Sequence, residues 1–241
     1  MMILHMNNYK KNQWIRGFNK LKILLGLCII NTYLTLFYKN FTIRGTPMND
    51  KYIVFISHCF FNPHSKVINY GKNPIEGEPI IRGKILSLFF EHNIGAIQLP
   101  CPEMVCYGLK RWGHVKDQFE HVHYRKVSRE LLMPCIDELK EYINNGYQLF
   151  AVIGIERSPS CGVAKTYRGD WKGEIGGNPL FKDNQVEGIY LADEKGLFME
   201  ILEEMLLEIG VKTAFYGYSP KEGEEFQKLI EDKIKAVAKN G

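Results

Sequence analysis

Short runs of apolar residues alternate along the chain with longer segments of helical periodicity. The apolar runs lie at residues 52–57, 94–99 and 149–155, with a further candidate at 211–218, and they lack regular polar alternation. Such runs are typical of parallel strands that are buried on both faces. Together with the helical segments they predict an α/β fold, a single three-layer domain with a small, mostly parallel sheet flanked by helices.

Three segments are predicted to be helices. Residues 124–145 and 197–209 each carry an apolar stripe at helical spacing, and each stripe ends at a glycine. The last helix is predicted to open with Ser219, Pro220 and Glu222, which form a capping-box sequence with proline at the first helical position.

A glycine-rich stretch at residues 162–188 is too long for a plain connection between two elements. It predicts either a lid over a site or a surface excursion with a small hairpin of its own. The sequence pattern does not choose between these two structures.

Residues 1–47 do not fit the pattern of the domain. They hold seven of the 31 Lys and Arg residues and no Asp or Glu, and residues 23–38 are mostly apolar. This is the outline of a secretory signal or short anchor, but the segment lacks an A-x-A-like cleavage site and is shorter than the roughly 20 residues of a spanning helix. We therefore expect a non-domain extension, either a weak signal or anchor or a stretch upstream of a true start at Met48.

The domain itself is then predicted to span residues 48–241. Without a convincing export signal we expect a cytoplasmic protein, or a membrane-anchored one if residues 21–42 are translated and inserted. No stable membrane partner is expected unless residues 1–47 are expressed.

Composition and charge narrow the class of partner. The chain is 45% hydrophobic and 24% charged, which is ordinary for a globular protein. After residue 47 it holds 24 Lys and Arg against 27 Asp and Glu. A slightly acidic body without a basic stripe argues against nucleic acid as a partner and favours a small-molecule substrate.

Three cysteines follow three of the predicted strands. Cys59 and Cys101 each come two residues after a strand, and Cys161 comes six residues after the third. Because the loops at the carboxyl ends of neighbouring parallel strands meet at one crevice, we expect these thiols to converge. Cys135 lies on an apolar helix face and is expected in the core, whereas Cys106 is either core or a fourth sulfur near the site.

Converging thiolates suggest a metal centre. Zinc sites usually show C-x2-C pairs, which are absent, and His114, His121 and His123 lie in a polar segment that suits a loop better than a zinc site. Three cysteines without a nearby fourth suit a 4Fe-4S cluster in which one iron is open to substrate. An open iron is a Lewis acid with an affinity for sulfur.

Three motifs then carry a resemblance to a known family. The chain reads SHCFFN at 57–62, LPCPE at 99–103 and RSPSCG at 157–162, and in this order it resembles the thiouracil desulfidase family. The segments that follow the first and second motifs differ from that family's usual sequence. The chain therefore looks like a related branch whose thiolated substrate need not be thiouracil.

The resemblance implies a 4Fe-4S cluster held by Cys59, Cys101 and Cys161. It also implies an enzyme that removes sulfur from a thiocarbonyl compound, releasing hydrogen sulfide and the oxo product without net redox change. The family's catalytic acidic residue corresponds to Glu103, and its catalytic serine corresponds to Ser158.

For several residues within or near the three motifs, a structural role is the alternative to a functional one. Ser160 is expected to cap its turn through the hydroxyl, and Asn62 to shape the turn after Cys59. Arg157 is expected to pair with Glu156 at the surface, with stabilisation of charge near the cluster as the alternative. Trp112, together with Lys110 and Arg111, is expected either to form a wall of the pocket or to lie in an exposed surface loop.

Two other functions compete with a desulfidase. A non-catalytic carrier of metal, an iron-sulfur cluster or sulfide would keep the three thiolates but show no turnover. An enzyme with a thiol nucleophile and no metal would depend on a single cysteine rather than on all three.

Overall fold

The computed structural model describes residues 51–68, 75–170, 172–174, 177–182 and 185–238. The expectations for residues 1–47 and for the translation start at Met48 lie outside this part of the chain. Within it, no helix has the length and apolar character needed to cross a membrane.

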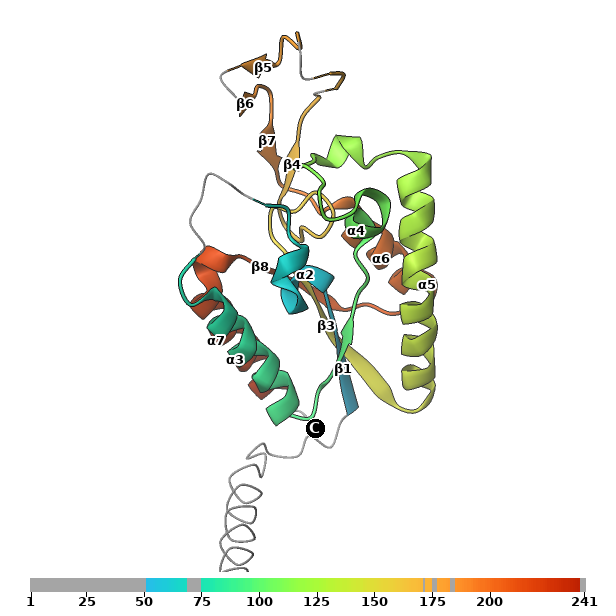
Figure 1. The fold of residues 1–241 in the computed structure, drawn as a ribbon. Coiled ribbons are helices and arrows are strands. Elements are labelled where there is room, and N and C mark those ends of the chain that lie inside the picture. Colours follow the sequence, from blue (N-terminus) through green and yellow to red (C-terminus); the bar gives the residue numbers. More distant parts are fainter. Residues whose placement is uncertain (1–50, 69–74, 171, 175–176, 183–184, 239–241) are drawn as a thin grey trace, which may run out of the picture. The chain divides into compact units, whose positions relative to one another are not determined.

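A four-stranded parallel sheet forms the centre of the domain (Figure 1). Its strands are β1 (Lys51–Ile56), β2 (Gly95–Gln98), β3 (Tyr147–Ile155) and β8 (Ala214–Tyr218). All neighbouring pairs are parallel, in the order β2-β1-β3-β8. The four predicted strands are therefore confirmed, with boundaries that shift by one to three residues.

The strand order creates a switch point between β1 and β3. The chain leaves β1 toward β2 on one side and then crosses to β3 on the other side of β1. Loops that leave the carboxyl ends of such a pair run in opposite directions, and the crevice between them is where open α/β sheets bind ligands. At this end Ser57 donates from its backbone N–H to the Ile153 carbonyl oxygen at 2.9 Å, which joins the two strand ends.

Helices cover both faces of the sheet, so the predicted three-layer α/β architecture is confirmed. Helices α3 (Glu78–Glu91) and α7 (Gly223–Ala238) pack together on one face, and α5 (Val122–Asn144) and α6 (Leu197–Glu208) pack together on the other (Figure 1). The central strand residues are fully buried between these layers, among them Val54, Phe55, Val152 and Ile153. This explains why the strands read as continuous apolar runs rather than alternating ones.

Helix α3 was not among the predicted helices. Its sequence, EPIIRGKILSLFFE, distributes apolar residues around the whole helix and so leaves no distinct stripe. Ile85 and Phe89 enter the core, whereas Ile80 and Phe90 remain exposed. The site depends on this helix because Arg82, near its start, points back toward the loop after β1.

The predicted capping box at Ser219 is wrong. Residues Pro220–Glu222 form a 3-10 turn, and α7 begins only at Gly223. The backbone N–H of Glu222 donates to the Ser219 carbonyl oxygen at 3.0 Å. In a capping box this N–H group would donate to the serine hydroxyl instead. The Ser219 side chain therefore makes no capping bond.

The glycine-rich stretch and the residues just after it form two small antiparallel pairs. Strand β4 (Thr166–Arg168) pairs with β7 (Tyr190–Ala192), and β5 (Phe181–Lys182) pairs with β6 (Gln185–Val186). The described residues thus contain the hairpin of the surface-excursion alternative (Figure 1). A role as a lid stays a prediction.

Candidate functional site

The three cysteines lie beyond the carboxyl ends of three adjacent strands. Cys59 is in the short helix α2 (His58–Phe61) after β1, and Cys101 caps the start of α4 (Pro102–Tyr107) after β2. Cys161 lies in the turn after β3, and its carbonyl oxygen accepts from the Ile155 backbone N–H at 2.9 Å. The sheet order places the first and third of these loops on the two sides of the switch point.

The thiols are close enough to perturb one another. A hydrogen bond between Cys59 and Cys161 lowers the pKa of the Cys59 thiol and raises the pKa of the Cys161 thiol. Burial, with a contribution from the nearby charge of Glu103, raises the pKa of Cys101 to about 11. The charge of Cys59 also raises the pKa of Cys101, and the charge of Cys101 raises that of Cys161. All three thiols are free rather than in disulfides.

The three thiols are soft donors of the kind that iron-sulfur clusters take from cysteine. Among the described residues, no group of three or more His, Cys, Asp or Glu side chains is arranged to hold a metal ion. Three soft thiol donors from three adjacent loops nevertheless fit, in kind and number, a cluster that leaves one iron without a protein ligand. A cube-shaped cluster also needs its ligands spread more widely than a single ion does.

Glu103 is held by a buried arginine. The Arg111 Nε–H donates to Glu103 Oε2 at 2.9 Å, and its two Nη groups donate to the carbonyl oxygens of Gly108 at 3.0 Å and Ser65 at 2.7 Å. Burial raises the pKa of Glu103, and the Arg111 charge opposes that effect. Arg111 therefore ties the loop after β2 to the loop after β1.

From sequence, Arg111 is expected only beside Trp112, in a pocket wall or an exposed loop. It lies between Lys110 and Trp112, which are exposed, and nothing in the local pattern marks the middle residue as buried. Trp112 is 64% exposed, and its ring stacks on His114 at 5.5 Å. The exposed-loop alternative fits Trp112, and the partnership with Glu103 depends on tertiary structure.

The SPSCG turn is capped by Ser158 rather than by Ser160. The Ser158 Oγ accepts from the backbone N–H groups of Ser160 at 3.3 Å and Cys161 at 3.0 Å, so this serine caps the turn. The expectation that Ser160 caps the turn is wrong, because its hydroxyl is fully buried and accepts from the Tyr124 O–H at 3.0 Å. Because two amides fill the Ser158 acceptor sites, its own hydroxyl proton remains for donation.

The start of α6 packs tightly against this turn. The backbone N–H groups of Leu197 and Phe198 donate to the carbonyl oxygens of Pro159 and Ser160, both at 3.0 Å. A Cβ atom added at Gly196 would lie 2.5 Å from the Ser160 carbonyl oxygen. Glycine is needed here because the two backbones approach so closely.

Arg82 fixes the loop that carries Cys59. Its Nη1 donates to the carbonyl oxygens of Cys59 at 2.7 Å and Phe60 at 3.1 Å, and its Nη2 pairs with Glu78. The guanidinium also lies over the rings of Phe60 and Tyr218. Its positive charge helps to lower the pKa of Cys59, after the larger effect of the bond to Cys161.

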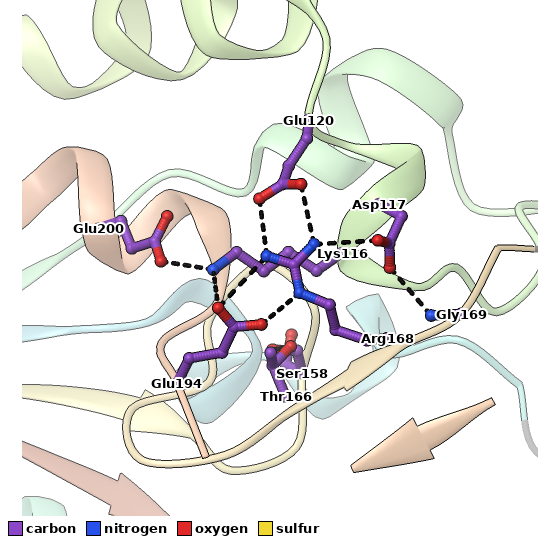
Figure 2. A network of polar contacts seen from close by, with 9 residues as sticks. All are labelled: Lys116, Asp117, Glu120, Ser158, Thr166, Arg168, Gly169, Glu194 and Glu200. Atoms are coloured by element: carbon purple, nitrogen blue, oxygen red, sulfur yellow. Dashed lines mark hydrogen bonds and ion pairs between the residues drawn. The ribbon is translucent and has the colours of Figure 1, made fainter. Parts of the chain in front are cut away.

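A network of ion pairs holds the β4–β7 hairpin beside the turn (Figure 2). Lys116, although buried, pairs with Glu194 at 3.1 Å and also with Glu200. Arg168 pairs with Asp117 at 3.0 Å, with Glu120 at 2.8 Å and with Glu194. A neighbouring residue of the hairpin reaches the turn directly, since Thr166 Oγ1 donates to the Ser158 carbonyl oxygen at 3.1 Å.

Two further cysteines and two histidines of the described residues have structural surroundings. Cys106 and Cys135 are partly buried against the core, which agrees with the prediction for Cys135 and with the core alternative for Cys106. His121 caps α5 by accepting from the Tyr124 backbone N–H at 3.3 Å. The side chain of His114 lies within a group of aromatic rings, with Tyr107 at 4.6 Å and Phe119 at 5.0 Å.

Two expectations about residues next to the motifs have different outcomes. The turn role of Asn62 is confirmed, because its Oδ1 accepts from the His64 backbone N–H at 3.2 Å. The pairing of Arg157 with Glu156 is wrong. The Glu156 carboxylate instead accepts from the backbone N–H groups of Ala164 and Lys165, each at 3.1 Å.

The comparisons with known proteins add one distant relative. The chain is 29% identical over 190 residues to an uncharacterized protein of Methanocaldococcus jannaschii, and the match covers 78% of this chain and 100% of that protein. No family model and no solved structure matches the chain.

Proposed function

We propose that this protein is an iron-sulfur-dependent desulfidase that converts a small thiocarbonyl compound and water into the oxo compound and hydrogen sulfide. The observation that carries the proposal is the convergence of three thiols at the switch point of the sheet, next to a buried carboxylate. The resemblance of the same three cysteine motifs to the thiouracil desulfidase family is consistent with it.

Cys59, Cys101 and Cys161 would hold the 4Fe-4S cluster. A bound cluster would supply a Lewis acid with an affinity for sulfur, which suits a thiocarbonyl substrate. The chain's contribution is to hold three thiolates in place. Arg82 supports this by anchoring the Cys59 loop through its backbone carbonyl groups.

Glu103 is proposed as the general base. Its Oε2 is occupied by Arg111, whereas no hydrogen bond to Oε1 is found among the described residues. Oε1 is therefore available to orient a water molecule and take its proton. A buried carboxylate with a raised pKa suits this role, because a base works best when its pKa approaches the working pH.

Ser158 is proposed as the proton donor to the departing sulfur. Two backbone amides fix its hydroxyl oxygen and leave its proton directed away from them. The proton that Glu103 takes from water then replaces the one that Ser158 has given up, so that over the whole reaction only one water molecule is consumed. Its oxygen replaces sulfur on the carbon, its two protons leave with the sulfide, and no electron is transferred.

The competing function is a carrier of a cluster or sulfide. One observation favours it: the bond from Arg111 gives Glu103 a structural role that needs no catalysis. In a carrier the same three thiolates would bind the cluster, and the wild-type protein would release no sulfide from thiolated compounds.

The substitution Glu103→Gln separates the two functions. Glutamine keeps the size of the side chain and an oxygen that accepts from Arg111, but it is not a base. After anaerobic reconstitution, we expect the variant to keep the wild-type iron content and to release sulfide from thiouracil and related thiolated bases at least about 100-fold more slowly. The control is Glu130→Gln, which changes an exposed glutamate on α5 and should leave the rate unchanged.

Two results would contradict the proposal. One is a Glu103→Gln variant that is as active as the wild-type protein. The other is a fully loaded wild-type protein that releases no sulfide from any compound tested, which is the result expected of a carrier.

A further inference from the structure

A buried chain of hydroxyl groups leads to the sulfur of Cys161. The Tyr124 O–H donates to Ser160 Oγ at 3.0 Å, and Ser160 Oγ lies 3.7 Å from Cys161 Sγ. Tyr124 and Ser160 are both fully buried. Water therefore does not compete for these bonds, and in such surroundings each hydrogen bond strengthens the next.

The donor and acceptor roles in this series of hydrogen bonds depend on whether the Cys161 sulfur carries a proton. A neutral Cys161 donates its S–H to Ser160 Oγ, but a thiolate has no proton and can only accept. Because Tyr124 already fills one acceptor site of Ser160, the hydroxyl proton of Ser160 is free to turn toward the sulfur. Burial raises the pKa of Tyr124 well above its usual range, so the tyrosine stays protonated as the donor.

The ring of Tyr124 is fixed before any metal is bound. It stacks face to face on Phe119, with 4.4 Å between the centroids and 1° between the planes. It also lies near the beginning of α5, where His121 accepts from the Tyr124 backbone N–H. The hydroxyl is thus held toward Ser160 by packing that does not depend on the ligand.

We propose that Tyr124 and Ser160 are positioning residues that donate a relayed hydrogen bond to the Cys161 thiolate and thereby set the electron density of the bound cluster. This inference rests on the proposed function, because it needs the cluster. A hydrogen bond to a ligand sulfur draws electron density away from the irons and favours the more negative, reduced state. It would also keep the open iron a better acceptor for the substrate sulfur.

The test measures the reduction potential of the cluster rather than turnover. The reconstituted wild-type protein, Tyr124→Phe and Ser160→Ala are titrated with a chemical reductant, and the reduced cluster is followed by electron paramagnetic resonance. Tyr124→Phe removes only the hydroxyl group and keeps the ring on Phe119. In both variants we expect the equilibrium constant for reduction of the cluster to fall several-fold to about tenfold. A tenfold fall corresponds to a reduction potential about 59 mV lower for one electron.

Tyr107→Phe is the matched control. Tyr107 belongs to the same group of rings, with its centroid 6.3 Å from that of Tyr124, but its hydroxyl is bonded to His121 at 3.2 Å rather than to the turn. It should leave the potential unchanged. The double variant Tyr124→Phe/Ser160→Ala should shift no further than Ser160→Ala alone, because the tyrosine acts through the serine.

The possible failures are distinguishable. A wild-type protein that binds no cluster would overturn the proposed cofactor and this inference with it. A wild-type cluster whose potential is the same in Tyr124→Phe and Ser160→Ala would overturn the inference alone, as would an equal shift in Tyr107→Phe. If Tyr124→Phe does not fold, Ser160→Ala by itself decides between these results.

Discussion

Replacement of Arg111 by methionine probes the link between the loops after β1 and β2. Methionine retains much of the apolar stem but has no donors, so the change removes the bonds to Glu103, Ser65 and Gly108. The side chains of Arg111 and Glu103 are only 3% and 11% exposed. The variant therefore leaves a carboxylate without its buried partner.

The structure sets the expected size of the effect. Removing one partner of a buried ion pair costs about 3–5 kcal/mol of folding free energy, whereas an exposed pair contributes up to about 1 kcal/mol. Because both side chains are buried, Arg111 and Glu103 form a buried ion pair. We therefore expect Arg111→Met to lower the free energy of unfolding by about 3–5 kcal/mol at neutral pH, which is a large share of the stability of a typical domain.

The loss should depend on pH in a defined direction. Burial already raises the pKa of Glu103, and loss of the arginine charge raises it further. A carboxyl group whose folded-state pKa lies above its unfolded value near about 4.3 stabilises the fold at low pH, and that stability is lost as pH rises toward the folded-state pKa. The destabilisation by Arg111→Met should therefore be smaller at pH 5 than at pH 8.

Urea unfolding of the metal-free protein, followed by circular dichroism, measures both effects. The control is Arg129→Met, which breaks an ion pair with Glu208 whose side chains are 39% and 56% exposed. It should cost no more than about 1 kcal/mol. A double variant, Glu103→Leu with Arg111→Met, should recover much of the loss because no unpaired charge remains. The reasoning is refuted if Arg111→Met is no less stable than Arg129→Met.

Other predictions concern the turn and the hairpin. Gly196→Ala should lower stability in thermal unfolding by about 1–3 kcal/mol, because its Cβ would meet the Ser160 carbonyl oxygen at 2.5 Å, whereas Gly113→Ala meets nothing within 4 Å and is the control. Arg168→Gln removes the charge at the centre of the hairpin network and should speed proteolytic cleavage of the β4–β7 hairpin, and cleavage at the wild-type rate would contradict its role. Bonds from Arg168 lower the pKa of Glu194, so this residue stabilises the fold above its unfolded pKa of about 4.3 and that stability is lost as pH falls through its folded-state pKa. Between pH 7 and pH 4 the free energy of unfolding should consequently fall less in Glu194→Gln than in the wild-type protein.

The sheet could be predicted because burial on both faces leaves a local mark on the sequence. Each central strand is a continuous apolar run, and the alternation with helices implies parallel order. Helix α3 could not be recognised in this way, since it has apolar residues all around and exposes some of them. The failed capping box at Ser219 has a similar cause, because a 3-10 turn and a helix start can share one sequence.

The thiols of the site were predictable, but most of their partners were not. Position after a strand is a local property, and it was enough to select Cys59, Cys101 and Cys161. The roles of Arg111 and Tyr124 depend on which way a side chain turns once distant segments have packed together. The capping of the turn by Ser158 instead of Ser160 shows the same limit, since only the backbone of the turn decides which hydroxyl meets the amides.

Anaerobic reconstitution, with iron and inorganic sulfide counted per chain, tests the cluster most directly. We predict about four of each in the wild-type protein, as the 4Fe-4S formula requires. Alanine at Cys59, Cys101 or Cys161 should greatly reduce both counts, and alanine at Cys135 should not. A wild-type protein that retains no more iron than these three variants would contradict an iron-sulfur centre on the three thiols.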